Sequence, residues 1–508
     1  MNRNYPQSPT TSTTNLDPAF AASGERFLSL IRSFTALPQA SHADIERFLE
    51  TEGRELMRQI YQDELHRQAA AQMSEAPSGV DAVVATRRWT KRGLRTVFGD
   101  VVVRRSAWKE PETGGIRPLD AKLNLPSGLY SHGVAEQLGA EVSQVSFDQA
   151  VENLSNRGII VPKRQAEELT VGVAAHFDEF YATARGAMAP SMTAHLVMSL
   201  DGKGIAMRRE DLRPETKKKA EKKGKKVRSR LGRGEKSNQK RMSEVAAIWW
   251  QEPVARCPAD IVGDLEGVKS DDRPRLPRPV GKRVWASVVR DIPTVVAEVF
   301  DEAERRDPQF AHAWVVLLDG DPDQVNAVKR EAKRRKVNVH IVLDLIHVTE
   351  YLWKAASALH ATDTAGRTAA DRWVDRYLLT LLRGSSSAVA SSLSNKAAKG
   401  QMSESARKEL RNAARYLRNH RELLEYDKAL SFGFPIATGV IEGACRYLVK
   451  DRMGITGARW RLERAEAVLR LRAIRASGDW EEYISFYERR EFANNHAWYA
   501  ASAGREVA

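Results

Sequence analysis

The chain has 508 residues, more than one hydrophobic core ordinarily holds, so roughly two to four domains are expected. Hydrophobic residues make up 42%, enough for folded domains, and no apolar run approaches the roughly 18 residues that a membrane-spanning helix needs. The two cysteines, Cys257 and Cys445, stand far apart, which excludes a disulfide framework or a cysteine-based zinc site and suits a reducing compartment. Residues 1–36 lack the apolar core of a signal peptide and predict a disordered leader, so we expect a cytoplasmic protein.

Positive charge is concentrated in one tract. The net charge is +14, which predicts a polyanionic partner. Residues 214–241 hold 13 Lys/Arg and 3 Glu, so this tract alone contributes +10. Its composition fits a solvated loop as well as a mobile arm that neutralises DNA phosphates, and the two are compatible. The candidates for DNA contact in the tract are Lys217, Lys218, Lys219, Lys222, Lys223, Lys225, Lys226, Arg228 and Arg230.

Residues 37–80 predict a long amphipathic helix. Ser41 can cap it, with Asp44 three residues on in an imperfect capping box, and apolar residues recur at helical spacing from Ile45 to Leu65. Such a helix packs on its own domain or forms a dimer contact. The sequence leaves both readings open.

A β-hairpin is predicted for residues 88–108, within the segment 81–110. Val, Thr, Phe and Trp favour strands, and Gly99 with Asp100 suits a two-residue turn. Arg and Lys decorate both arms, so one face could lie on DNA. A purely structural hairpin fits the pattern equally well.

Residues 111–190 predict helices that include a helix-turn-helix-like pair. Residues 146–156 form a short amphipathic pattern that stops at Gly158, and Pro162 opens a second helix at a position where proline is tolerated. Many helical pairs share this arrangement without touching DNA. If the second helix reads DNA, the residues on its first turn are Lys163, Arg164 and Gln165.

Strands alternate with helices over residues 191–348. Apolar runs end in Asp201 and Asp319, and residues 243–251 form another strand candidate. Strands and helices alternating at these lengths indicate a parallel or mixed sheet in an α/β domain. The basic tract falls between the first two strand candidates, as a loop.

Helical patterns dominate the rest of the chain. Residues 349–430 are helical throughout and too long for a simple connection, so they predict an inserted helical subdomain. Residues 431–478 predict a helix from Gly439, a break near residues 454–457 and a second helix. Residues 479–508 are expected to form a tail.

Three carboxylates are candidates for catalysis. Asp201 and Asp319 each follow an apolar strand and precede a glycine, and functional groups collect at the carboxyl ends of strands in open α/β sheets. One strand-end aspartate is more often a turn residue than a ligand, but two with a third carboxylate are more specific. The third is Glu442, placed one turn into a helix among small and apolar residues, where its charge needs a partner.

Oxygen ligands of this kind suit Mg²⁺ or Mn²⁺. Two such ions, about 3.5–4 Å apart, activate the attacking oxygen and stabilise the leaving oxygen in phosphodiester displacement. Arg446, four residues after Glu442, is the competing explanation, because it could balance the glutamate as an ordinary helix pair. We count Arg446 with the residues that support the site.

Several phrases together resemble the ISKra-type insertion-sequence transposases of the Mutator-like group of bacterial DDE transposases. They are DGKGI at 201–205, LLDGD at 317–321, DLIHVTEYLW at 344–353 and GFPIATGVIEGACRYLVKDRMGITGARW at 433–460. The N-terminal phrases RGLRTVFGDVVVRR, RPLDAKLNLPSGLYSHG and VPKRQAEEL also resemble this family, so the likeness covers nearly the whole chain. The GVIEGACR block is specific, whereas each Asp-Gly alone is weak.

The resemblance implies an RNase H-like core with Asp201, Asp319 and Glu442 as catalytic residues, a helical insertion before the glutamate, and two divalent metal ions. It also implies double-stranded DNA partners, namely the terminal inverted repeats and the target. Location at the bacterial nucleoid and at least a dimer follow from such a reaction. Members often carry cysteines between the hairpin and the PLDA phrase, but this chain has none there, which excludes a structural zinc at that place.

The family's acidic-histidine pair corresponds to Asp344 and His347, which we interpret as active-site support or DNA contact and not as metal ligands. Their spacing alone is weak, because a histidine three residues from an aspartate is usually an ordinary hydrogen-bonded pair. Trp353 and Trp373 could stack a flipped base, although core packing is the more frequent role of such residues.

The sequence therefore predicts a DNA transposase that hydrolyses transposon ends and transfers the freed 3′-hydroxyl to target DNA. Two alternatives stay open: a domesticated, non-catalytic DNA-binding regulator, and an RNase H-like nuclease acting on branched nucleic acid. An ATPase is disfavoured, because no G-x-x-x-x-G-K-[ST] loop is present.

Overall fold

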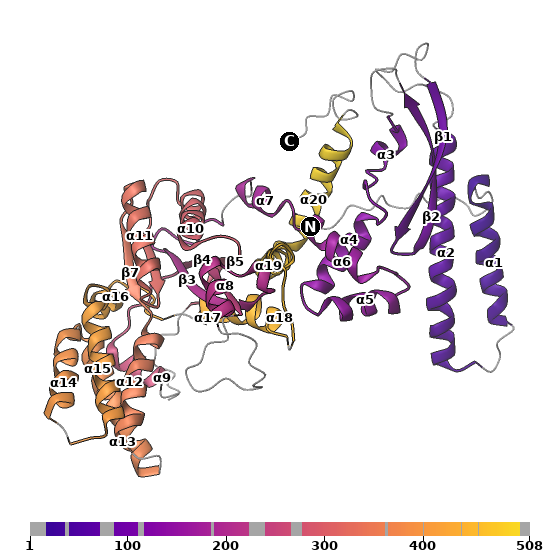
Figure 1. Ribbon diagram of the computed structural model, residues 1–508. Helices are drawn as coiled ribbons and strands as arrows, with labels where there is room; N and C mark the ends of the chain where they lie inside the picture. Colours follow the sequence, from indigo (N-terminus) through magenta and orange to yellow (C-terminus); the bar gives the residue numbers. More distant parts are fainter. Residues whose placement is uncertain are drawn as a thin grey trace. The chain divides into compact units, whose positions relative to one another are not determined.

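The computed structural model describes residues 17–35, 40–71, 86–109, 116–183, 187–222, 239–265, 277–360, 364–399, 401–437, 439–455 and 457–497 (Figure 1). The chain is a mixed α/β protein with a helical N-terminal region that includes a hairpin, then a five-stranded mixed sheet with helices, then a helical C-terminal part. It divides into two compact units. The first comprises Met1–His176 with Glu481–Ala508, and the second comprises Phe177–Trp480.

Two helices begin the first unit, where a disordered leader was expected up to residue 36. Asp17 caps the short helix η1 (Pro18–Phe20), and α1 (Ala21–Thr35) follows. Helix α1 packs on α2 (His42–Ala71), where Arg26 forms an ion pair with Glu52 at 2.7 Å. The expectation of disorder was therefore wrong for residues 17–35, because α2 supplies contacts that the local composition does not reveal.

Helix α2 begins as its sequence predicted. The backbone N–H of Ser41 donates to Asp44 Oδ2 at 3.2 Å, and the backbone N–H of Asp44 donates to Ser41 Oγ at 3.3 Å, which makes a reciprocal cap. The buried residues of α2, among them Leu65 and Ala69, pack against Leu94 and other apolar residues of the hairpin.

The hairpin joins β1 (Thr86–Thr96) to β2 (Gly99–Lys109) in antiparallel register. Its turn is formed by Val97 and Phe98, so the expected turn at Gly99 and Asp100 was wrong by two residues. Thr96 closes the turn, because its hydroxyl donates to the Gly99 carbonyl at 2.8 Å and accepts from the Phe98 N–H at 3.2 Å.

Short helices complete the first unit. They are α3 (Pro118–Lys122), α4 (His132–Val142), α5 (Phe147–Asn156) and α6 (Lys163–Val173), and α4, α5 and α6 pack on one another. The C-terminal residues were expected to be a tail, but Trp480–Asn495 form α20, which ties back to this unit. Tyr483 donates to the Val173 carbonyl, and Asn124 donates to the Glu488 carbonyl at 3.0 Å.

A five-stranded sheet lies at the centre of the second unit, in the order β5-β4-β3-β6-β7. β3 pairs antiparallel with β4, and β4 pairs antiparallel with β5, whereas β6 and β7 run parallel to β3. The strands are β3 (His195–Ala206), β4 (Lys240–Gln251), β5 (Val280–Ser287), β6 (Trp314–Leu318) and β7 (Val339–Leu343).

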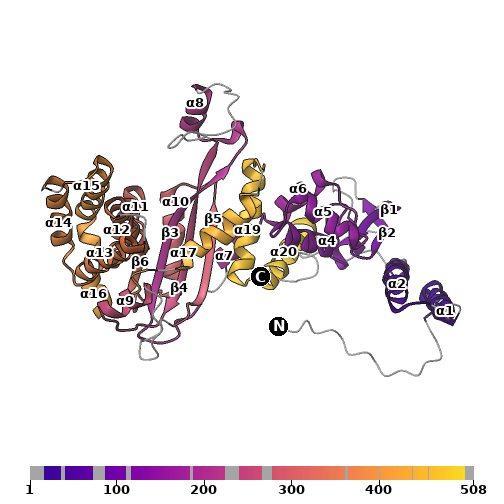
Figure 2. The same ribbon diagram turned by 90° about the horizontal axis from the view of Figure 1, so that it is seen from below.

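Helices cover both faces of this sheet. Nine consecutive residues of β4, from Ser243 to Gln251, are buried, and alternate residues of a strand point to opposite faces. Helix α10 (Ile292–Arg306) packs on β4 and on α11 (Pro322–Arg335), while α17 and α19 pack on β4 and β5. Figure 2 shows α17 and α19 beside β4 and β5.

The helical insertion follows β7 directly and consists of α12 to α16, drawn in orange tones in Figure 1. Its first helix begins at Leu345, a few residues earlier than the sequence suggested, because Asp344 caps it. The insertion helices are α12 (Leu345–Leu359), α13 (Thr364–Leu382), α14 (Ser386–Lys399), α15 (Glu404–Asn419) and α16 (Tyr426–Ser431).

The last part of the second unit returns to the sheet. Helix α17 (Gly439–Ala444) continues into η4 (Cys445–Lys450), a π-helical segment, and then into α18 (Asp451–Met453) and α19 (Leu462–Ser477). The other short helices are α7 (Phe177–Thr183), η2 (Arg209–Asp211), α8 (Pro214–Lys222), α9 (Pro258–Leu265) and η3 (Arg421–Leu423). None of the helices within the described ranges combines the length and the apolar character that crossing a bilayer requires.

Candidate active site

The three parallel strands β3, β6 and β7 bring their aspartates to one edge of the sheet. Ser199 of β3 pairs with Leu317 of β6, so the same register continued by two residues places Asp201 opposite Asp319. Leu318 pairs with Leu343 of β7, and continuing by one residue places Asp344 beside Asp319. The carboxyl ends of the parallel strands therefore bring together three of the acidic residues that the sequence analysis named as site candidates.

The sequence suggested that Asp201 lies at the end of its strand, but it lies within β3. The strand continues to Ala206 because β4 pairs with it along this whole length. The half-buried carboxylate of Asp201 is held at both oxygens: the Gly202 N–H donates to Oδ1 at 2.6 Å, and the Cys445 thiol donates to Oδ2 at 3.0 Å. These two donors fix the orientation of the carboxylate.

Asp319 directly follows β6 and is half-buried. Burial raises the pKa of its carboxyl, and the negative charges of Asp201 and Asp321 raise it further, while the N–H of Asp321 and the nearby His347 oppose this. Asp321 and Asp323 are near enough in the sequence to substitute for Asp319, but the Asp321 carboxylate caps α11 by accepting from the N–H groups of Asp323 and Gln324. Asp319 Oδ1 accepts the Asp321 N–H at 2.8 Å, and Asp319 stays the preferred candidate because it directly follows the strand.

Glu244 is a fourth acidic residue of this region, and the sequence analysis missed it. It lies on β4 opposite Gly202, is only 6% exposed, and accepts a hydrogen bond from Gln324 at 3.3 Å. Burial raises its pKa, and the charges of Asp321 and Asp201 add to the effect. A glutamate inside an otherwise apolar strand is the one signal that could have identified it.

Asp344 and His347 flank Asp319 on the side of β7. Asp344 is 5% exposed, its N–H donates to the Leu318 carbonyl at 2.7 Å, and its carboxylate accepts from the Ile346 N–H at 2.8 Å as the cap of α12. His347 is half-buried on the first turn of α12, and its Nδ1 is buried without a hydrogen-bond partner among the described residues. Asp344 therefore caps α12, and His347 places a polar ring beside it.

Glu442 does not form a group of possible metal ligands with these aspartates. It is exposed on α17, a helix that packs on β3 and β4. Cys445, three residues later, touches Asp201, and residues three apart lie on the same helical face about 5–6 Å from each other. Within the described ranges no three acidic, histidine or cysteine side chains are grouped closely enough to hold an ion.

The helix that carries Glu442 changes its winding directly after it. The π-helical segment η4 starts at Cys445 and leaves carbonyl groups without their usual helical partners, and Arg472 of α19 donates to the Leu448 carbonyl at 2.9 Å and to the Tyr447 carbonyl. Arg446, which could have paired with Glu442, instead lies 3.8 Å from Asp451. A π-helix has more residues per turn than an α-helix, so Arg446, four residues after Glu442, no longer lies on the same face as Glu442.

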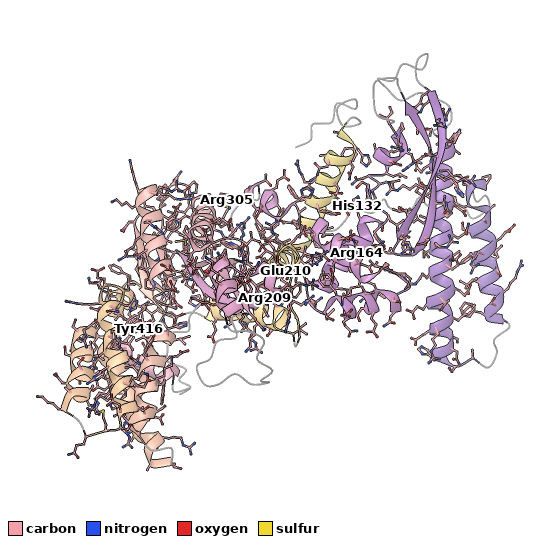
Figure 3. The ribbon with its side chains drawn as sticks, viewed as in Figure 1. His132, Arg164, Arg209, Glu210, Arg305 and Tyr416 are labelled. Atoms are coloured by element: carbon pink, nitrogen blue, oxygen red, sulfur yellow. The ribbon has the colours of Figure 1, made fainter. Side chains whose placement is uncertain are left out.

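The helical insertion holds the two strand ends by their backbones. Tyr416 of α15, labelled in Figure 3, donates to the Asp319 carbonyl at 2.8 Å, and His420 Nε2 lies 2.8 Å from the Gly320 carbonyl. Tyr426 donates to the carbonyl of Leu343, the residue before Asp344, at 2.9 Å. The insertion thus positions the turns that carry two of the candidate carboxylates.

Gly320 is required at this turn. Its φ is +91°, a conformation that favours glycine, and an added Cβ would lie 2.9 Å from Leu343 and 3.0 Å from His420. The close approach of the insertion to the Asp319 turn depends on this residue. Neither the tyrosines nor His420 was identified from the sequence.

The two tryptophans named as stacking candidates differ in exposure. Trp373 is 2% exposed and packs at 4.5 Å from the ring of Tyr377, so it belongs to the core of the insertion. Trp353 is 38% exposed on α12.

The two helices predicted for residues 146–156 and after Pro162 are present as α5 and α6, which pack on each other. Lys163 forms an ion pair with Asp148 at 2.7 Å, Arg164 forms one with Glu168 at 3.2 Å, and Gln165 accepts from the Tyr130 hydroxyl. Arg164, labelled in Figure 3, keeps 89% of its side chain exposed. All three residues lie at the surface on the first turn of α6.

The basic tract is not a loop throughout. Lys217, Lys218, Lys219 and Lys222 belong to α8, whereas the last two residues, Lys240 and Arg241, belong to β4. Arg241 donates to the Val288 carbonyl at 2.7 Å, and burial lowers its pKa, so it is part of the sheet. Other DNA-contact candidates lie outside the described residues: Lys223, Lys225, Lys226, Arg228 and Arg230.

Neither the comparison with protein-family models nor the comparison with curated proteins finds a match for this chain.

Proposed function

We propose that the chain is a DNA transposase with an RNase H-like core. It cleaves DNA at the terminal inverted repeats of an insertion sequence and transfers the freed 3′-hydroxyl to target DNA. The observation that carries the proposal is the register of β3 with β6, which places Asp201 opposite Asp319 at the carboxyl edge of the sheet. As the sequence resemblance implies, Asp201 and Asp319 act with Glu442.

The strand order supports the fold part of the proposal. In the RNase H-like fold, three antiparallel strands come first, two parallel strands follow, and the first strand lies in the middle of the sheet. β3, β4 and β5 followed by β6 and β7, in the order β5-β4-β3-β6-β7, have this arrangement. A helical insertion between β7 and α17 also agrees with the proposed architecture.

The residues of the site fit divalent metal ions of the Mg²⁺ or Mn²⁺ type. Carboxylate oxygens are the preferred donors of both ions. Burial first, and then the charges of Asp201 and Asp321, raise the pKa of Asp319, and a bound cation would stabilise its ionised form. Asp201, Asp319 and Glu442 would hold the two proposed ions. When bound, such ions activate the attacking water and stabilise the leaving oxygen.

The chain's own groups prepare the site in other ways. The Gly202 N–H and the Cys445 thiol orient the Asp201 carboxylate. Tyr416 and His420 fix the turn of Asp319 through its backbone, so the side chain projects from a rigid support. The basic tract, with its net charge of +10, supplies positive charge for the DNA partners.

Cleavage of a labelled DNA carrying the element's own inverted repeat, with Mg²⁺ or with EDTA, tests the proposal. Wild type should nick at the repeat boundary only with metal, and Glu442→Gln should lose this activity by about 100-fold or more while DNA binding persists. Glu463→Gln is the matched control, because Glu463 is also an exposed glutamate near the start of a helix. Equal cleavage by both variants would remove Glu442 from the mechanism.

One observation favours a second candidate, a non-catalytic DNA-binding regulator. Glu442 is exposed, and no group of three possible ligands is assembled among the described residues. A regulator would bind the repeats specifically but would cleave with neither Mg²⁺ nor Mn²⁺. The same assay therefore separates the two candidates.

A further inference from the structure

The hairpin presents two like charges directly opposite each other. Lys91 of β1 pairs in register with Arg104 of β2, and both side chains are exposed. The ion pairs found in the described part of the chain include neither residue. Like charges opposite each other across two strands are destabilising, so this arrangement is unfavourable unless an anion lies between them.

An aromatic ring lies next to this pair. Trp89 is two residues before Lys91 on β1, so both side chains point to the same face of the hairpin, and Trp89 is 50% exposed. Arg87 lies over the Trp89 ring at 5.0 Å and orders it from one side. A half-exposed tryptophan held in this way offers its other surface to a ligand.

A hollow of about 440 Å³ joins the aromatic ring to the two cations. It is lined by Trp89, Lys91 and Arg104 with Thr90 of the hairpin, and by residues from the end of α2, namely His66, Ala69 and Ala70. The volume is in the range of small-ligand sites, about 300–1,000 Å³. Gln62 keeps α2 fixed against the hairpin here, because it both donates to and accepts from the Val102 backbone, at 2.8 Å and 2.7 Å.

We propose that this hollow binds an unpaired nucleotide of a DNA strand, with its phosphate between Lys91 and Arg104 and its base against Trp89. A base in a duplex is stacked on both sides and cannot offer its face to a tryptophan, whereas an unpaired base can. The proposal rests on the proposed function only in that DNA is the polyanionic partner. It assigns single-strand binding to the first unit, separate from the carboxylates.

Anisotropy of a labelled oligothymidine and of a duplex of equal length tests the site in the full-length protein. Trp89→Ala should weaken single-strand binding about tenfold or more and leave duplex binding nearly unchanged, while Trp89→Phe keeps most of the affinity. Replacing both Lys91 and Arg104 by Ala should lower the salt dependence of single-strand binding by about 0.7 in log–log slope, as expected for one neutralised phosphate.

Two controls match these variants. Phe98→Ala removes another exposed aromatic residue of the same hairpin, and Arg47→Ala removes an exposed cation of α2 that is paired with Asp44. Both should bind the oligothymidine as wild type does. Photo-crosslinking of an oligonucleotide that carries 5-iododeoxyuridine, followed by peptide mapping, should place a crosslink at Trp89.

The proposal is overturned if Trp89→Ala and the double variant of Lys91 and Arg104 bind the oligothymidine like the controls. It is also overturned if single-strand and duplex binding fall equally. None of these measurements involves cleavage, so their failure is distinct from a failure of the proposed transposase activity.

Discussion

Asp201 on β3 and Asp319 directly after β6 come opposite each other when the parallel register is continued two residues beyond the pair Ser199 and Leu317. They are 118 residues apart in the chain, yet the sheet register alone brings them together. Their mutual repulsion contributes to the raised pKa of Asp319, after burial. Two carboxylates held close without a balancing charge are typical of a site adapted to a cation.

The Asp319 site makes stability depend on pH. Because its folded pKa lies above the unfolded value of about 3.9, the fold loses stability as the pH rises from the unfolded pKa to the folded pKa, and the full penalty remains at higher pH. Asp319→Asn should therefore raise the melting temperature in EDTA at pH 7–8 by roughly 1–3 °C, a modest gain because Asp319 is partly exposed.

This gain should shrink as the pH falls towards about 4, where the carboxyl is protonated in both states. The same variant should abolish cleavage and retain end binding. Asp323→Asn, an exposed neighbour, should change neither property. A melting temperature that falls at neutral pH in the Asp319 variant would contradict the argument.

The two cysteines should differ in reactivity. Cys257 is exposed, whereas Cys445 is buried, and burial together with the charge of Asp201 raises the pKa of its thiol. With a chromogenic disulfide reagent at pH 8, one thiol per chain should react quickly and the second slower by about 100-fold or more until the protein unfolds. Cys257→Ser should remove the fast phase alone, and two equally fast thiols would place Cys445 outside the core.

Tyr416→Phe tests the contact between the insertion and the active site. The variant keeps the ring that stacks on Tyr351 but loses the hydrogen bond to the Asp319 carbonyl, which costs about 1 kcal/mol of stability. We also expect a higher Mg²⁺ concentration for half-maximal cleavage, because the Asp319 turn is held less firmly. Tyr377→Phe, which loses only a bond to Ser392, is the control and should leave the metal requirement unchanged.

Deletion of residues 223–238 tests the basic tract without disturbing α8 or β4. These residues hold 7 of the chain's Lys/Arg residues and 1 Glu. Affinity for all DNA sequences should fall by a similar factor, and binding should depend less on salt, because phosphate contacts dominate such tracts. A loss confined to the terminal repeats would mean that the tract reads bases.

The sequence was most informative where one element carries its own signal. The capped helix that starts after Ser41, the alternation of strands and helices, and the break after Met453 are all present in the structure. Each depends on hydrophobic periodicity or on a local cap, which are properties of neighbouring residues.

Features that depend on distant partners were missed. β5 was not identified, because its buried Arg283 looks unfavourable until Glu302 of α10 pairs with it. Glu244 was missed although a glutamate within an apolar strand is a signal, because its place beside Asp201 depends on the pairing of β4 with β3. The extent of β3 beyond Asp201 was misjudged for the same reason, since β4 supplies the pairing.

The insertion lies between Asp319 and Glu442 in the chain, so the ribosome makes Glu442 well after Asp319. A ribosome that has completed the Asp319 turn must add about 120 more residues, on the order of 10 s of synthesis, before Glu442 is made. During that interval the nascent chain already contains its basic tract and can attach to nearby DNA. Under the proposed function, a growing polypeptide therefore associates with the DNA near its own gene before it can cut, and a chain truncated within the insertion competes for DNA without breaking it.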